Sequence, residues 1–201
     1  CVCVMLATGG AASAQTAAAD PATAAVTIPS AIPLFPLPDV VMFPGLSRPF
    51  QIYEPRYRAM IADALKADRM IGMVLIKPGF EADYEGRPPI FEIGCASHIE
   101  DYQELPDGRY LILVRCLVKF RVTSEDQTRL YRMARIDARP ETPKDAELAP
   151  LSTLKERLAS LLDAIVPLGS DPPPVALPDG AYVNAVASYV EIPETARQGL
   201  L

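Results

Sequence analysis

The sequence contains no tryptophan, and its one histidine is His98. Histidine is the commonest metal ligand and general base, so this scarcity leaves little material for metal sites or histidine-based catalysis. Lysine and arginine number 19 against 25 acidic residues, which gives a formal net charge of −6. Proteins that neutralise nucleic-acid phosphates usually carry a basic surplus. The charge balance therefore argues against a nucleic-acid partner.

Sequence motifs for nucleotide binding and catalysis are absent as well. No G-x-x-x-x-G-K-[ST] segment is present to bind phosphate, no G-x-G-x-x-G opens a helix, and no G-x-S-x-G turn occurs. None of the five lysines lies in an apolar strand-to-helix context that favours a Ser–Lys dyad. His98, at the end of a predicted strand, is expected to be a surface or hydrogen-bonded residue. We therefore predict a protein that is not an enzyme, without catalytic residues or a cofactor.

Acidic residues are the remaining candidates for a metal site. Glu81, Asp83 and Glu85 alternate in a polar segment, and the pair Glu100-Asp101 follows a predicted strand. Calcium takes oxygen ligands, but the spacing here is not that of an EF-hand loop. A solvated acidic loop is the expectation, and no metal site is predicted.

The first residues are unusual because the chain begins with cysteine. The segment CVCVMLATGGAASAQ joins an apolar run to Ala12-Ser13-Ala14, the A-x-A pattern of a secretory signal. A disordered alanine-rich leader and a lipidated Cys1 are the alternatives. The apolar run is too short to span a membrane, and no membrane partner is predicted for the mature form. A truncated signal would imply an exported or periplasmic protein, and otherwise a cytoplasmic one.

Four cysteines are present, and Cys1 and Cys3 lie in this leader. Cys95 and Cys116 have neither a C-x-x-C spacing nor a nearby histidine, so zinc is not expected. In an exported protein the two could form one disulfide. We expect two buried free thiols instead, because free cysteine packs as a small hydrophobic residue.

The pattern along the chain predicts an α+β fold, a small barrel followed by helices. Residues 1–30 read as leader and linker, residues 31–140 as the barrel, and residues 141–201 as a helical tail that we expect to be incomplete. Residues 32–37 contain Pro33 and Pro36, which predicts an edge or bulged strand. Further strands are expected at residues 49–53, 70–76, 90–99, 110–122 and 131–138.

Details of these segments give further predictions. Pro55 suits the first position of a helix, whose apolar face would be formed by Tyr57, Met60, Ile61, Ala64 and Leu65 and which would end near Asp68. Gly94 inside a strand indicates a bulge or a close approach of backbone. The strand from Tyr110 is nearly continuously apolar at first, which predicts cover on both faces. The tail is expected to contain an amphipathic helix marked by residues 151–165 and helices starting at Asp179 and Pro193.

Rigid aromatic side chains and prolines are concentrated before residue 58 and in the polar loop of residues 77–89. Apolar surfaces with such aromatics suit unfolded or extended peptide segments. The candidate peptide-binding residues are Phe35, Phe43, Phe50, Tyr53, Tyr57, Phe80 and Tyr84, although several of them are expected to be core.

Five segments in this order are similar to one family: IPLFPLPDVVMFPG, FQIYEPRYRAMIADAL, RMIGMVL, IGCASHIE and LPDGRYLILVRCLVKFRV. They resemble the amino-terminal domain of Lon protease, which also occurs as a free-standing protein. The resemblance covers residues 31–139 strongly and extends weakly into YVNAVASYVEIPETARQGLL. Cys116 stands where many relatives have glycine. The resemblance implies a PUA-like β-barrel with an appended helical bundle, and a role in recognising protein substrates.

The function predicted from residues and resemblance together is a non-catalytic module that binds unfolded or exposed apolar protein segments. Two alternatives remain open at this point. One is a hydrolase with an acidic or serine-based site that no motif reveals. The other is a small RNA-binding barrel, which the acidic balance disfavours.

Overall fold

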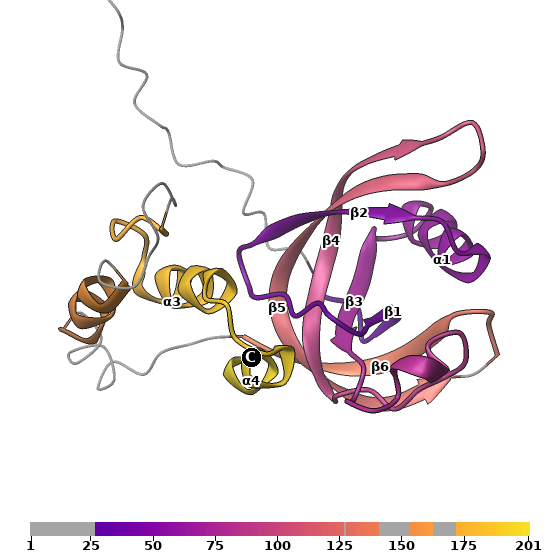
Figure 1. The fold of residues 1–201 in the computed structure, drawn as a ribbon. Coiled ribbons are helices and arrows are strands. Elements are labelled where there is room, and N and C mark those ends of the chain that lie inside the picture. Colours follow the sequence, from indigo (N-terminus) through magenta and orange to yellow (C-terminus); the bar gives the residue numbers. More distant parts are fainter. Residues whose placement is uncertain (1–26, 127, 141–152, 163–171) are drawn as a thin grey trace, which may run out of the picture.

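The computed structural model of the chain describes residues 27–126, 128–140, 153–162 and 172–201 (Figure 1). The strands are β1 (Ala31–Leu37), β2 (Ser47–Ile52), β3 (Met70–Leu75), β4 (Ile93–Glu104), β5 (Tyr110–Asp126) and β6 (Arg132–Arg139). The helices are α1 (Pro55–Leu65), the single 3-10 turn η1 (Glu81–Asp83), α3 (Asp179–Tyr189) and α4 (Glu194–Leu200), and residues 153–162 are also helical. Within these ranges, no helix has the length and apolar character that crossing a membrane requires.

Strand β5 organises the mixed sheet. Its first half, residues 110–115, pairs with β2, and its second half, residues 119–126, pairs with β6. Strand β4 pairs antiparallel with both halves of β5. From β4 the sheet continues through β3 to β1, which returns to β6. The pairings therefore close a ring of β1, β3, β4, β5 and β6, and β2 is attached to β5 outside that ring.

Strand β1 tolerates two prolines because it changes partners in its middle. Residues 31–34 pair with β6, and residues 34–37 pair in parallel with β3. Each half thus has one side without a partner strand. Proline has no N–H to donate, and on that side no hydrogen bond between strands is lost. As a whole β1 lies between β3 and β6 and is not an edge strand, but each of its halves has one partner strand.

Helix α1 buries the apolar face that its sequence predicts. Pro55 occupies the first turn, and Tyr57, Met60, Ile61 and Ala64 are buried against the sheet. The helix ends at Leu65, three residues before the predicted end, because the Arg69 N–H bonds back to the Ala64 carbonyl at 3.0 Å. Arg69 has a φ of 56°, a left-handed conformation that turns the chain into β3.

Two apolar clusters fill the ring. The first joins the buried face of α1 to Phe35, Ile112 and Val114, and the second centres on Phe120, Ile32 and Leu34. Gly94 of β4 lies where a side chain would meet the Met73 carbonyl of the neighbouring strand. The close backbone approach predicted for Gly94 is confirmed. The pairing of β4 with β5 shifts elsewhere: β5 has the extra residue Leu117 opposite Ala96 and Ser97, and β4 has the extra residue Glu100 between Ile99 and Asp101.

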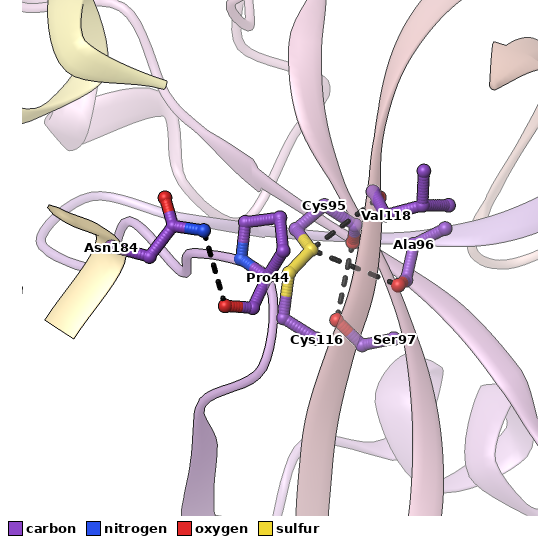
Figure 2. The surroundings of a disulfide bond; sticks show 7 residues. All are labelled: Pro44, Cys95, Ala96, Ser97, Cys116, Val118 and Asn184. Atoms are coloured by element: carbon purple, nitrogen blue, oxygen red, sulfur yellow. Dashed lines mark hydrogen bonds between the residues drawn. A yellow bond between two sulfur atoms is a disulfide. The ribbon is translucent and has the colours of Figure 1, made fainter. Parts of the chain in front are cut away.

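Cys95 of β4 and Cys116 of β5 are joined by a disulfide, with 5.8 Å between their Cα atoms (Figure 2). Both residues are fully buried. The expectation of two free thiols is therefore wrong. The antiparallel pairing of β4 with β5, which places Ser97 opposite Cys116, brings the two cysteines together.

The C-terminal helices dock on the turn that precedes β2. Ala187 of α3 and Leu201 pack with Val41, Phe43 and Leu75. Figure 1 shows α3 and α4 together on one side of the ring. The helix of residues 153–162 contacts α3 through Leu162, and its Lys155 bonds to Asp179 at 3.0 Å. The signal-like leader, residues 1–14, and positions 151 and 165 of the predicted tail helix lie outside the described residues.

Candidate functional site

A groove of about 410 Å³ lies on the part of the sheet formed by β2, β5 and β4. Its lining residues are Pro49, Phe50, Gln51, Asp101, Tyr102, Gln103, Leu111, Ile112 and Leu113. Figure 1 shows β4 and β5 extending beyond the ring as a long hairpin, with β2 beside them. The groove is thus built on paired strands, which hold its side chains at fixed spacing.

Strict alternation along β5 exposes two leucines in this groove. Tyr110, Ile112 and Val114 are buried, while Leu111 and Leu113 keep 41% and 36% of their surface exposed. Successive side chains of a strand point to opposite faces. The prediction that this strand is covered on both faces is therefore wrong for its first half.

Neighbouring strands set the borders of the leucine row. In the register, Leu111 lies between Gln51 of β2 and Gln103 of β4, and Leu113 lies between Pro49 and Asp101. Residues directly opposite each other in antiparallel strands share one face. The exposed face is therefore an apolar strip with two amides and one carboxylate beside it.

Two aromatic residues border this region. Phe50 and Tyr102 both pair with Ile112, so their side chains share the face of Ile112 and not that of Leu111 and Leu113, although both are among the residues that line the groove. The Phe50 ring packs edge-on against Phe35, with 5.9 Å between centroids, which fixes its orientation. The Arg69 guanidinium lies 5.6 Å from the Tyr102 ring centroid, a favourable cation–π distance.

The structure separates the seven candidates from the sequence into core and surface residues. Phe35, Phe43 and Tyr57 are buried, Phe50 and Tyr84 are half-buried, and Tyr53 and Phe80 are 63% and 40% exposed. Of the seven, only Phe50 lines the groove. Sequence reasoning missed Leu111, Leu113 and Tyr102, and because residues 110–114 are all apolar, no alternation in the sequence marked the two leucines as exposed.

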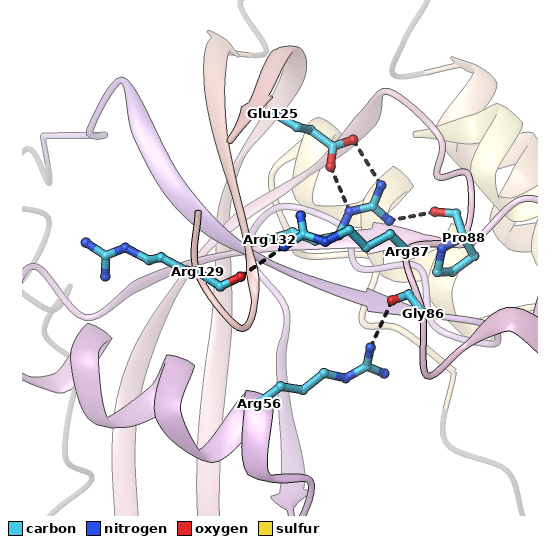
Figure 3. A network of polar contacts seen from close by, with 7 residues as sticks. All are labelled: Arg56, Gly86, Arg87, Pro88, Glu125, Arg129 and Arg132. Carbon is cyan, nitrogen blue, oxygen red and sulfur yellow. Dashed lines mark hydrogen bonds and ion pairs between the residues drawn. The ribbon is translucent and has the colours of Figure 1, made fainter. Parts of the chain in front are cut away.

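Arg56 of α1 holds the loop of residues 77–89 in place (Figure 3). Its guanidinium donates to the carbonyls of Tyr84, Glu85 and Gly86 at 2.7, 2.9 and 3.1 Å. It also pairs with the Glu54 carboxylate at 2.9 Å. The same guanidinium lies 5.0 Å from the Tyr84 ring centroid. One arginine thus satisfies three carbonyls of a loop that lacks a strand partner there.

Arg132 and Arg87 connect the other end of this loop to the β5–β6 hairpin through hydrogen bonds. Arg132 forms a two-point ion pair with Glu125, at 2.7 and 3.1 Å, and donates to the Pro88 carbonyl at 2.6 Å. Arg87 donates to the Arg129 carbonyl at 2.9 Å. Side-chain hydrogen bonds therefore hold this loop against α1 and the β5–β6 hairpin. The exposed Phe80 belongs to this loop.

A polar network of Asp63, Arg129 and Tyr131 joins α1 to the start of β6. The Tyr131 hydroxyl donates to the Asp63 carboxylate at 2.7 Å and accepts from Arg129 at 2.6 Å. Burial and the Asp63 contact raise the pKa of Tyr131. The network therefore connects α1 to the residues before β6 through one buried hydroxyl.

Raised tyrosine pKa values predict loss of stability in alkali. Burial raises the pKa of Tyr57, Tyr84, Tyr110 and Tyr131 above the ordinary value of 10.0. Near pH 10 an unfolded tyrosine releases a proton that the folded one retains, so the unfolded state is stabilised relative to the folded state as the pH rises. We expect the free energy of unfolding, measured by urea titration with circular dichroism, to fall above pH 10. Tyr131→Phe should reduce that slope, and a flat profile to pH 11 would contradict this account.

Among the residues that the structure describes, no three histidine, cysteine or acidic side chains gather as metal ligands. Glu81, Asp83 and Glu85 are exposed, and the Glu81 carboxylate accepts from the Gly79 N–H. His98 is half-buried in β4.

Comparisons with known proteins agree on one family. Residues 31–201 match the model of the ATP-dependent protease La (LON) substrate-binding domain. Lon protease 2 of Myxococcus xanthus is 29% identical over 181 residues, which cover 87% of this chain and 22% of that protein. The Lon protease of Trichlorobacter lovleyi is 31% identical over 140 residues, covering 68% of this chain and 17% of that protein. The chain thus spans about a fifth of the length of these relatives.

Solved structures show the same fold at lower identity. The Lon N-terminal domain protein from Xanthomonas campestris has a TM-score of 0.57 and 21% identity, and the match covers 84% of this chain and 88% of that one. The N-terminal domain of the Mycobacterium avium complex Lon protease has a TM-score of 0.57 at 18% identity, with 85% and 89% covered.

Proposed function

The chain belongs to the family of the Lon substrate-binding domain, and on that basis we propose that it is a protein-recognition module. In this proposal it holds unfolded or exposed apolar segments of other proteins and catalyses no reaction itself. The proposal includes the description of the strand ring as a PUA-like barrel, residues 31–140, with a helical tail, residues 141–201. Closure of the strand pairings supports the barrel description.

One observation carries the proposal: an exposed leucine row on a rigid sheet face. Leu111 and Leu113 are two residues apart on β5, so their side chains are about 6.5 Å apart. An extended peptide repeats its side chains on one face at the same interval. Such a peptide can therefore place alternate apolar side chains against the leucines, with Gln51 and Gln103 beside them on the same face.

The unpaired edge of β2 offers main-chain hydrogen bonds beside that row. Within the described residues, β2 pairs only with β5. A bound segment that adds to this edge would gain affinity from backbone groups that do not depend on its sequence. Pro49 removes one donor from β2, which limits uncontrolled pairing between copies of the protein. Because a strand added to this edge lies two strands from β5, a neighbouring stretch of the same bound chain would contact the groove, and those side-chain contacts would select apolar segments.

Charge narrows the choice of bound segments. The net charge of −6 and Asp101 at the groove disfavour acidic segments. The amides of Gln51 and Gln103 can bond to a neutral backbone without desolvating a charge. Apolar segments with neutral or basic flanks are therefore the proposed partners, and nucleic acid and membranes are not.

Fluorescence anisotropy of a labelled, permanently unfolded casein-type chain tests the proposal. We expect saturable binding without ATP, competition by apolar extended peptides, and no competition by a folded protein of equal size. Absence of binding across a peptide array would contradict the proposal. Peptide cleavage that survives purification would favour the hydrolase, and RNA binding that weakens steeply with salt would favour the RNA-binding barrel.

A further inference from the structure

The Cys95–Cys116 disulfide lies where β5 changes partners. Pairing with β2 ends at Arg115, and pairing with β6 begins at Lys119. Cys116 lies between these two stretches, next to a bulge in which β5 has the extra residue Leu117 opposite Ala96 and Ser97 of β4. The register between β4 and β5 shifts at this point. The disulfide therefore holds β4 against β5 where their ladder of backbone hydrogen bonds is irregular.

The backbone of Cys116 holds the turn that precedes β2. The Cys116 N–H donates to the Leu46 carbonyl at 2.9 Å, and the Gly45 N–H donates to the Cys116 carbonyl at 2.9 Å. Gly45 has a φ of 86°, which suits glycine, and the turn closes tightly around this pair of bonds. A displacement of Cys116 would therefore displace the whole turn.

The C-terminal helices are anchored on both strands that the disulfide joins. Asn184 of α3 donates to the Pro44 carbonyl in that turn at 3.4 Å, and Figure 2 shows these groups beside the two sulfur atoms. Gln198 of α4 donates to the Ile93 carbonyl at 3.0 Å, two residues before Cys95 on β4. Both amide side chains are buried, so neither bond is easily replaced by water. The spacing of the two anchor points depends on how β4 lies against β5.

We propose that the redox state of this disulfide controls how firmly α3 and α4 dock on the ring. With the bond intact, the turn on β5 and the Ile93 carbonyl on β4 keep the spacing that Asn184 and Gln198 require. After reduction the strands are free to shift at the bulge, and docking weakens. This inference does not depend on the proposed peptide binding.

The chemistry is exchange with a thiol–disulfide couple. A dithiol reductant supplies two electrons and two protons, the S–S bond breaks to give two thiols, and the reductant becomes a disulfide. The reduced ring remains satisfied, because the Cys95 sulfur lies 3.5 Å from the Val118 carbonyl, to which a thiol can donate. An oxidising compartment would keep the tail docked, and a reducing one would loosen it. Since both sulfurs are buried, exchange requires local opening of the sheet.

Hydrogen exchange with mass spectrometry tests this coupling on the whole chain. We compare oxidised protein with the Cys95→Ala/Cys116→Ala double variant and with dithiothreitol-reduced wild type. Amides of α3 and α4 should exchange at least fivefold faster without the bond, whereas those of β6, whose buried residues belong to the second apolar cluster, should change less than twofold. Equal rates in α3 and α4, or equal acceleration in β6, would overturn the inference.

A reciprocal experiment keeps the test valid if the double variant fails to fold. Linkage requires that loss of docking also favours reduction of the disulfide. Asn184→Ala should therefore shift the thiol–disulfide equilibrium of the protein, measured in a dithiothreitol redox buffer, at least fivefold toward the reduced form. Val183→Ala, on the exposed side of the same helix, is the matched control and should leave that equilibrium unchanged. An equilibrium for Asn184→Ala equal to that of the control would refute the coupling.

Discussion

Replacement of Gly94 by alanine is expected to destabilise the protein by about 3 kcal/mol, or to prevent folding. A Cβ atom at this position would lie 2.4 Å from the Met73 carbonyl oxygen and 2.6 Å from a Val74 methyl group. The carbonyl belongs to the adjacent strand β3 and cannot move without breaking its pairing with β4. Urea unfolding followed by circular dichroism measures the change.

Two other glycine-to-alanine replacements serve as comparisons for the loss of stability expected at Gly94. Gly72 would place a Cβ atom against side-chain atoms only, the closest 2.7 Å away on Leu34, so Gly72→Ala should cost less. Gly199 in α4 has open space around it, and Gly199→Ala should be neutral or slightly stabilising because alanine favours helix. A Gly94→Ala protein within about 0.5 kcal/mol of wild type would show that β3 and β4 are not packed as described.

Replacement of both groove leucines, Leu111→Ser with Leu113→Ser, is expected to weaken binding of an unfolded chain at least tenfold. Each leucine would lose about 1 kcal/mol of apolar contact with a bound segment, because its exposed half is what the ligand covers. The fold should survive, since both side chains are already partly in solvent. Anisotropy titration measures the affinity, and unfolding measurements check the stability.

The matched control is Leu130→Ser. Leu130 is 78% exposed, more than either groove leucine, but it lies outside the groove in the hairpin between β5 and β6. We expect its variant to bind as wild type does. Equal losses of affinity for the control and the groove variant would indicate that any exposed apolar surface binds the unfolded chain. Unchanged affinity of the groove variant would show that the groove is not the binding site.

Local sequence patterns were sufficient to predict features that depend on neighbouring residues alone. The spacing from Tyr57 to Ala64 predicted the buried face of α1, and an isolated glycine predicted close approach at Gly94. The first half of β5 was misread because an apolar run does not reveal whether a second layer covers its outer face. That information comes from the arrangement of the other elements, which leaves Leu111 and Leu113 open.

Contacts between distant parts of the chain were beyond sequence reasoning. The disulfide depends on the strand register between β4 and β5, which no single segment encodes. Arg56 donates to backbone carbonyls 28 to 30 residues away. Every residue has a backbone carbonyl, so the sequence does not indicate which ones accept these hydrogen bonds. These contacts nevertheless decide which of the predicted aromatics are core and which remain exposed.

The central claim is that other proteins are held on the face formed by β2, β5 and β4. Hydrogen exchange of the protein with and without a saturating unfolded chain tests it most directly. The account predicts slower exchange of amides in residues 48–52, on the free edge of β2, and of residues 111–113 through reduced opening of the sheet. Protection confined to α3 and α4 or to the loop of residues 77–89, with the groove strands unchanged at saturation, would contradict it.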